Sequence, residues 1–174
     1  MKKMLLLIII VATIVALALF LAAQERTPVG SSACKLCHKS EQQGRQYTLW
    51  EATLHAKSFA SLSTDKAAEI GKALGIDKPN ESPQCLGCHA PLAAKAPAFK
   101  AEGVTCEVCH GAGSGYRKLN IMQDEAKAVQ NGLAVYADAA AIEAQCLKCH
   151  QNAHDVPFDF KKAWDKIKHP VPAK

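Results

Sequence analysis

The sequence predicts a mostly α-helical fold, with short helices and loops packed around cofactors. Three observations predict it. No stretch alternates apolar and polar residues convincingly enough to be a strand. Aromatic residues make up only 6% of the chain, which leaves little material for a conventional core. All eight cysteines fall into four Cys-x-x-Cys-His motifs, separated by 46, 16 and 35 residues, a spacing too irregular for a repeat array.

The four motifs predict covalently attached haem, because each cysteine pair can form two thioethers to one porphyrin while the histidine reaches the iron. Zinc would use the thiolates in closed four-cysteine sites, without needing a histidine after every second cysteine. A disulfide across a two-residue gap would be strained and reducible. We therefore expect four haem c groups. The thioether cysteines are Cys34, Cys37, Cys85, Cys88, Cys106, Cys109, Cys146 and Cys149, and the proximal histidines are His38, His89, His110 and His150.

The first residues predict export. Lys2 and Lys3 precede an apolar run over Met4–Ala23, as in a signal peptide. At 20 residues the run is also long enough to span a bilayer as a helix. Cleavage after Ala18 or Ala23 would release the protein, and retention would anchor it to the membrane. Both outcomes place the haem motifs in the periplasm or another extracytoplasmic space.

Residues 24–32 are expected to form a polar linker, and residues 33–174 a single tetrahaem domain. With fewer than 40 residues for each haem, the porphyrins must supply much of the buried apolar surface. We therefore expect the chain without haem not to fold stably, because binding energy of this kind is folding energy.

The helices are predicted from local signals. The proline-free stretch His38–Ala60 should be mostly helical. A second helix over Asp65–Leu74 should begin at Ser63 or Thr64 and end at Gly75.

Further along, residues 91–97 should be irregular because they are punctuated by proline. Helices are expected over Met122–Gln130 and Asp138–Cys146. A last helix should begin after Asp159, present an apolar face and end before Pro170.

The formal charge of +5 does not indicate a nucleic-acid partner. Without Lys2 and Lys3 it falls to +3, and each ferric haem with two ionised propionates adds about −1. The total is then near −1. Lysines close to haem edges would instead suit docking to an acidic redox protein.

Counting limits the iron ligands. Four irons offer eight axial positions, whereas the chain has seven histidines, so at most three haems are bis-histidine within a monomer. His55, beside apolar Leu54, and His169, at the end of an amphipathic helix, are the expected distal ligands. His154 lies in a polar segment and is expected to be solvated. Met122, the one methionine beyond the exported segment, is a further distal candidate.

Three segments resemble the tetrahaem cytochrome c-554 family, in a likeness that runs from about Ser32 to Pro170. They are Trp50 to Leu62, with its Trp…His-Ala-Lys pattern, Gly103 to Gly113 around the third motif, and Phe158 to His169.

The resemblance implies a helical fold with closely packed haems. It implies that His55 binds the iron of His150, that His169 binds the iron of His110, and that the haem of His89 is five-coordinate. The family has a further distal histidine after its third motif, for the first haem. This chain has none there. Met122, or less readily Tyr116, then becomes the candidate sixth ligand at His38.

These observations predict an electron carrier that relays single electrons between other redox proteins, such as cytochromes or membrane quinol-oxidising complexes, as a monomer. The alternative is a redox enzyme, acting on nitrogen oxides or peroxide at an open haem on His89. A stacked wire of chains, with His154 completing a neighbour's haem, is a third hypothesis. The electron-carrier hypothesis would be excluded if the reduced protein turned over a small molecule without passing electrons to other cytochromes.

Overall fold

The computed structural model describes residues 25–151, 154 and 156–171. The predicted signal or anchor over residues 1–23 lies outside them. Within the described part all regular structure is helical, with no strand, so the predicted fold class is confirmed. No helix in this part is long and apolar enough to cross a membrane.

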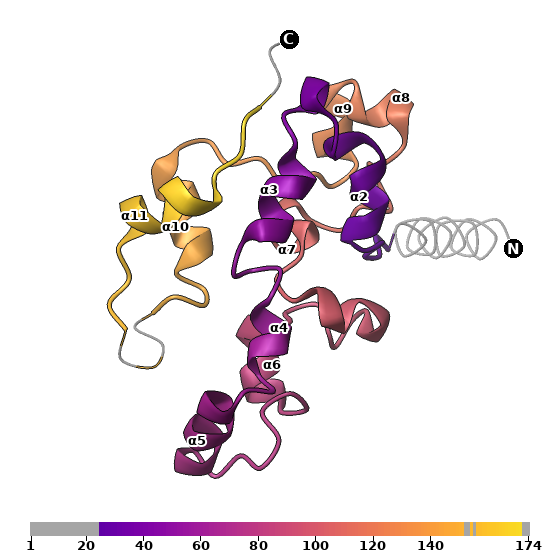
Figure 1. Ribbon diagram of the computed structural model, residues 1–174. Coiled ribbons are helices and arrows are strands. Elements are labelled where there is room, and N and C mark those ends of the chain that lie inside the picture. Colours follow the sequence, from indigo (N-terminus) through magenta and orange to yellow (C-terminus); the bar gives the residue numbers. More distant parts are fainter. Residues whose placement is uncertain (1–24, 152–153, 155, 172–174) are drawn as a thin grey trace, which may run out of the picture.

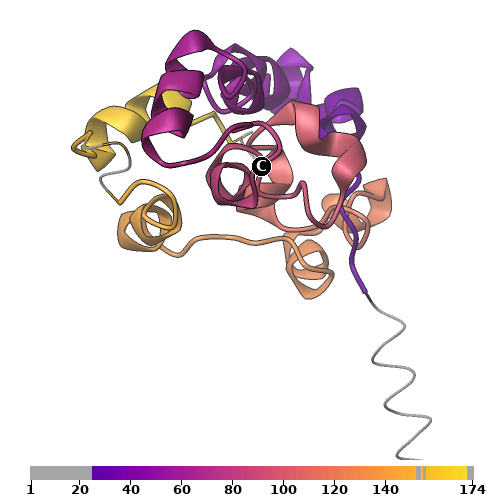
Figure 2. The same cartoon turned by 90° about the horizontal axis from the view of Figure 1, so that it is seen from below.

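The helices are short and are joined by turns (Figure 1). Figure 1 shows α3, α7, α4 and α6 in a central column, with α10 and α11 to one side. The view from below separates α10 and α11 from the column again (Figure 2). In chain order the elements are α2 (Ser31–His38), η1 (Glu41–Gln43), α3 (Gln46–Ala52), α4 (Ser58–Ser61), α5 (Asp65–Ala73), α6 (Pro83–His89), η2 (Pro97–Glu102), α7 (Cys106–His110), α8 (Leu119–Met122), α9 (Glu125–Gln130), α10 (Ala139–Cys146) and α11 (Phe160–Ile167).

Three predicted helix starts are confirmed. Thr64, Asp138 and Asp159 each accept a hydrogen bond from the backbone N–H three residues later, at 3.3, 2.8 and 3.0 Å. These bonds satisfy N–H groups that have no partner inside the first turn. Gly75, just beyond α5, adopts a φ of +71°, as expected of a glycine that ends a helix.

Two predicted helices are divided. The stretch His38–Ala60 is interrupted where Gly44 and Arg45 adopt φ angles of +86° and +56°, which reverse the chain before α3. The predicted helix Met122–Gln130 is wrong in its bounds, because α8 ends at Met122 and α9 begins afresh. The side chain of Asp124 caps α9 by accepting from Lys127 N at 3.1 Å. A local cap therefore outcompeted helix continuation.

The protein atoms alone form little core. Among the described residues the buried apolar side chains are Leu62, Ala90, Tyr116 and Ala128. Leu36, inside the first motif, is 87% exposed, and Leu54, beside His55, is 84% exposed. Apolar surface thus lies next to the attachment motifs and is not covered by the polypeptide, as expected if porphyrins pack there.

One buried carboxylate ties the start of the described chain to the third motif. Glu107 is 4% exposed and accepts hydrogen bonds from the backbone N–H groups of Val29, Gly30 and Gly113, at 2.7 to 3.1 Å. Glu102 similarly accepts from Ser31 N at 2.7 Å. Residues 29–31, part of the predicted linker, are therefore bound to the domain.

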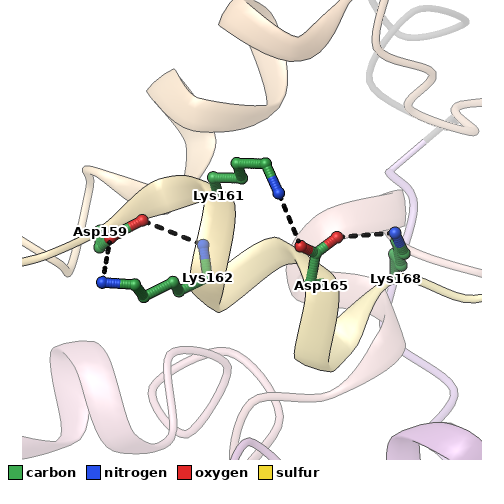
Figure 3. Close-up of polar contacts among 5 residues, drawn as sticks. All are labelled: Asp159, Lys161, Lys162, Asp165 and Lys168. Carbon is green, nitrogen blue, oxygen red and sulfur yellow. Dashed lines mark hydrogen bonds and ion pairs between the residues drawn. The ribbon is translucent and has the colours of Figure 1, made fainter.

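Helix α11 is held differently. Its apolar face of Phe160, Ala163, Trp164 and Ile167 is half-buried, and its charged side chains face outward. Figure 3 shows Asp165 between Lys161 and Lys168, at 3.2 and 2.7 Å, while Lys162 pairs with Asp159. Such exposed ion pairs contribute little stability.

Candidate haem sites

Each attachment motif is built on a helix. The first, second and third motifs end α2, α6 and α7 at His38, His89 and His110. In the fourth motif α10 ends at Cys146, and a turn places His150 just after it. Helical spacing brings the two cysteines of a Cys-x-x-Cys pair to one side, with the histidine following them.

The fold brings three histidines from elsewhere in the chain to three of the motif histidines. The ring centres of His55 and His150 are 6.1 Å apart. Those of His110 and His169 are 5.9 Å apart, and those of His89 and His154 are 6.4 Å apart. Among the described residues no group of three or more His, Cys, Asp or Glu side chains is arranged for a metal ion. Six of the seven histidines instead form three ring pairs.

The ring separations fit an iron atom bound between two imidazoles. A metal–nitrogen bond of about 2.0 Å, plus about 1.1 Å from nitrogen to ring centre, sets the two centres about 6.2 Å apart. Aromatic pairs elsewhere in the described residues span 4.8 Å for Phe158 on His150 to 6.4 Å for Phe160 and Trp164, so the fit rests on the pairing of motif histidines with second histidines as well as on the spacing. The residues present therefore fit axial coordination of haem iron.

The environment favours the neutral imidazole that iron binds. Desolvation lowers the pKa of His110 and His55, and the facing histidine lowers each further by like-charge repulsion. Desolvation also lowers the pKa of His150. A histidine that is uncharged at neutral pH presents a nitrogen lone pair to a metal without first losing a proton.

Two motif histidines are oriented through Nδ1. His89 Nδ1 lies 3.0 Å from the carbonyl oxygen of Ser58 and 3.2 Å from the hydroxyl of Ser61. His38 Nδ1 lies 3.3 Å from Gln46 Oε1. When Nδ1–H donates to such an oxygen, the tautomer is fixed and Nε2 keeps its lone pair for the iron.

A close backbone approach positions His55. Gly103 has a φ of +69°, and a Cβ there would lie 2.5 Å from Ser58 Oγ and 2.6 Å from the carbonyl oxygen of His55. Val104 N donates to that same carbonyl at 3.0 Å, and Trp50 Nε1 donates to Val104 O at 2.9 Å. The segment before the third motif therefore holds the turn that carries His55.

His38 is the motif histidine that faces no other histidine in the described residues, which include all seven. Of its two candidate partners, Met122 is half-buried at the end of α8. Tyr116 is buried, and its hydroxyl donates to Gly111 O at 2.8 Å. Desolvation, together with nearby Cys34 and Glu107, raises the pKa of Tyr116, which disfavours the tyrosinate that would bind iron.

Thiol contacts show which motifs adjoin. Cys34 of the first motif lies beside Cys106 of the third, and this neighbour is the main cause that lowers the pKa of the Cys106 thiol to about 7. Cys149 of the fourth motif, whose pKa is raised to about 11 mainly by desolvation, lies beside Cys88 of the second. Cys109 and Cys146 lie close enough to interact electrostatically. The motifs therefore form a connected series in the order first, third, fourth, second.

Two features were not foreseen from the sequence. His154 is exposed, as expected of a solvated histidine, but its ring also lies 6.4 Å from that of His89. Glu107 lies at a variable position of the third motif and gave no functional signal. The two glycines after His110 and the glycine before Cys106 offered a hint that backbone packs closely there.

A sequence profile described as "Cytochrome c554 and c-prime" matches residues 33–111. Cytochrome c-554 of Nitrosomonas europaea is 28% identical over 150 residues, covering 77% of this chain and 62% of that protein. Both matches support the cytochrome c-554 family. The resemblance predicted from the sequence is thereby confirmed.

The two matches support a c-type cytochrome with covalently bound haem. The chain spans under two thirds of the length of the relative it matches. No solved structure matches the chain.

Proposed function

We propose that this protein is an extracytoplasmic tetrahaem cytochrome that relays single electrons between other redox proteins. The observation that carries the proposal is the set of ring pairs, in which motif histidines meet histidines from distant segments at the spacing that axial coordination requires. When bound, haem c supplies reversible one-electron chemistry of its iron.

In this proposal the eight cysteines form the thioethers, and His38, His89, His110 and His150 are the proximal ligands. His55 is the distal partner of His150, and His169 is the distal partner of His110. Two imidazoles on one iron leave no free position for a substrate, so these two sites suit electron transfer rather than catalysis.

The arrangement of the motifs supports a relay. Successive members of the series first, third, fourth and second have cysteines in contact or close by. Groups attached to neighbouring cysteines are held close together by the polypeptide. The thiol pKa values given above describe the unmodified side chains, since a thioether does not titrate.

The chain's own residues set the properties of each site. Burial of His110 and the hydrogen bonds to Nδ1 of His38 and His89 control ligand basicity and orientation. The exposed lysines shown in Figure 3, Lys161 and Lys162 on α11 and Lys168 just after it, lie one to eight residues from His169 and offer a surface to an acidic partner. We propose cytochromes or quinol-oxidising complexes as partners, and a monomeric carrier.

Intact mass and pyridine haemochrome absorbance on the purified holoprotein test the haem count, for which we expect four. Stopped-flow mixing of the reduced protein with an oxidised small cytochrome should then show electron transfer that slows as salt concentration rises. A protein with fewer than four haems, or one that reduces no cytochrome, would contradict the proposal.

The enzymatic alternative requires an open iron on His89. The ring of His154 lies 6.4 Å from that of His89, which argues against a free distal face there. We therefore do not favour small-molecule chemistry at that site.

A further inference from the structure

The axial ligands of the irons held by His89 and His38 can be inferred from the ring pairs. This inference rests on the proposed attachment of four haems. The ring centres of His89 and His154 are 6.4 Å apart, against 6.1 and 5.9 Å for the two pairs discussed above. All three values lie close to the separation of about 6.2 Å that two imidazoles on one metal require. Geometry therefore gives no reason to treat the His89–His154 pair differently.

His89 is prepared to face a metal. Its Nδ1 is held by the Ser58 carbonyl at 3.0 Å and the Ser61 hydroxyl at 3.2 Å, both on α4. The remaining nitrogen, Nε2, is therefore the one that carries the lone pair. Ser58 also donates from Oγ to the backbone carbonyl of His89 at 2.7 Å, so the ring and its backbone are fixed by the same element.

His154 is held in an unusual backbone conformation. Its φ is +59°, and among the described non-glycine residues Arg45 is the one other with a positive φ. A left-handed conformation is unfavourable for a residue with a Cβ, and such residues concentrate where a side chain must be aimed. At Arg45 the same conformation starts α3, whereas at His154 it accompanies a ring turned to His89.

The placement of the motifs explains how His154 reaches His89. Cys149 of the fourth motif lies close enough to Cys88 of the second for the two thiols to interact electrostatically. A segment that leaves the fourth motif at His150 is therefore already beside the second. His150 faces His55, and four residues later His154 faces His89, so one short segment serves two neighbouring sites.

With His55, His169 and His154 each facing a motif histidine, no histidine remains for His38 within the described residues. His38 Nδ1 contacts Gln46 Oε1, and Gln46 Nε2 donates to Pro170 O at 3.0 Å. This leaves a proximal histidine that is oriented but has no histidine opposite it.

We propose that His154 is the distal ligand of the iron held by His89, so that the axial position without a histidine lies on the iron held by His38. The resemblance to the family implies the opposite distribution, with the open position on the iron of His89. Compared with the family pattern, this chain has His154 after the fourth motif and lacks a histidine after the third. The iron without a second histidine is then on the first motif, at the opposite end of the motif series from the second motif.

Low-temperature electron paramagnetic resonance of the ferric holoprotein tests this, after intact mass has confirmed four haems. We expect at most one high-spin iron in the unmodified protein. His154→Ala should convert exactly one further iron from low spin to high spin, and added imidazole should restore the original spectrum. Val156→Ala, at an exposed position on the same segment, is the matched control and should change nothing.

An unmodified protein with one high-spin iron whose spectrum is unaffected by His154→Ala would overturn the inference, because the open site would already be on His89. If His154→Ala loads fewer haems, His154→Met decides instead. It should raise the reduction potential of one haem by replacing imidazole with a thioether, and four unchanged potentials would equally overturn the inference. A count below four haems in the unmodified protein would contradict the proposed function itself.

Discussion

The region around the third motif and the region after the fourth motif are organised in different ways. In the first, the buried carboxylate of Glu107 gathers three backbone N–H groups, and Gly103 allows two segments to touch. In the second, α11 carries exposed ion pairs, and His150, His154 and His169 are all exposed. The polypeptide holds the first region together, whereas the second depends on what its histidines bind.

The largest expected effect is the loss of ordered structure in the region after the fourth motif when haem cannot attach there. In a Cys146→Ser/Cys149→Ser variant we expect residues 139–171 to lose protection from hydrogen exchange, because little protein surface covers them. Backbone amides of residues 29–31 and 102–116 should keep most of theirs. Equal loss of protection in both regions would show that they fold as one cooperative unit.

The next largest effect is expected at Glu107, in the region around the third motif. Glu107→Ala leaves three buried N–H groups without an acceptor, and we expect it to lower the free energy of unfolding by about 3 kcal/mol or more. Urea unfolding of the holoprotein measures this. Glu107→Gln is the matched control, since its amide oxygen still accepts hydrogen bonds, and it should cost less. An unchanged midpoint for Glu107→Ala would mean that water replaces the carboxylate.

The third effect is at the contact between the His55 turn and the third motif. Gly103→Ala introduces a Cβ against Ser58 Oγ and the His55 carbonyl, at a positive φ, and should cost about 1–3 kcal/mol. Because the turn carries His55, the variant should also alter the low-spin signal of one haem. Gly75→Ala is the matched control, because Gly75 has a similar φ of +71° but an added Cβ there meets nothing within 4 Å; it should cost less than Gly103→Ala and leave the haem signals unchanged.

The smallest effect is in α11. The hydrogen bond from Lys162 N lowers the pKa of Asp159 below its ordinary value of 3.8. A lowered folded-state pKa means that the cap stabilises the helix above about pH 4 and that this contribution is lost as pH falls through the folded value. Protection factors of the α11 amides, which correct for the intrinsic pH dependence of exchange, should therefore fall below that pH. Asp159→Asn, which caps without titrating, should reduce this fall to the part due to Asp165, whose pKa is also lowered, and leave protection near neutral pH unchanged.

Features set by neighbours in sequence could be predicted. The starts of α5, α10 and α11 follow from Thr64, Asp138 and Asp159, whose side chains bond to amides three residues away. Competition between local signals was harder to judge, since Asp124 starts a new helix inside the stretch Met122–Gln130 that was expected to be a single helix.

Long-range contacts could not be predicted from the residues alone. The pairing of His55 with His150, and of His110 with His169, was expected only through the resemblance. The position of His154 depends on the second and fourth motifs lying together, which their separation in sequence does not reveal. Glu107 was missed because its amide partners come from a segment 77 residues away.

The ring pairs also determine when in synthesis the sites can form. Each pair joins one histidine to a partner in the last 25 residues of the chain, across 95, 65 or 59 positions in sequence. Closing loops of this length is entropically costly and makes folding slow. A nascent chain that has reached residue 149 holds every cysteine but no ring pair. Formation of the ring pairs is therefore a late event, and a chaperone or attachment enzyme that handles this protein meets its cysteines well before the histidines that we propose as second axial ligands.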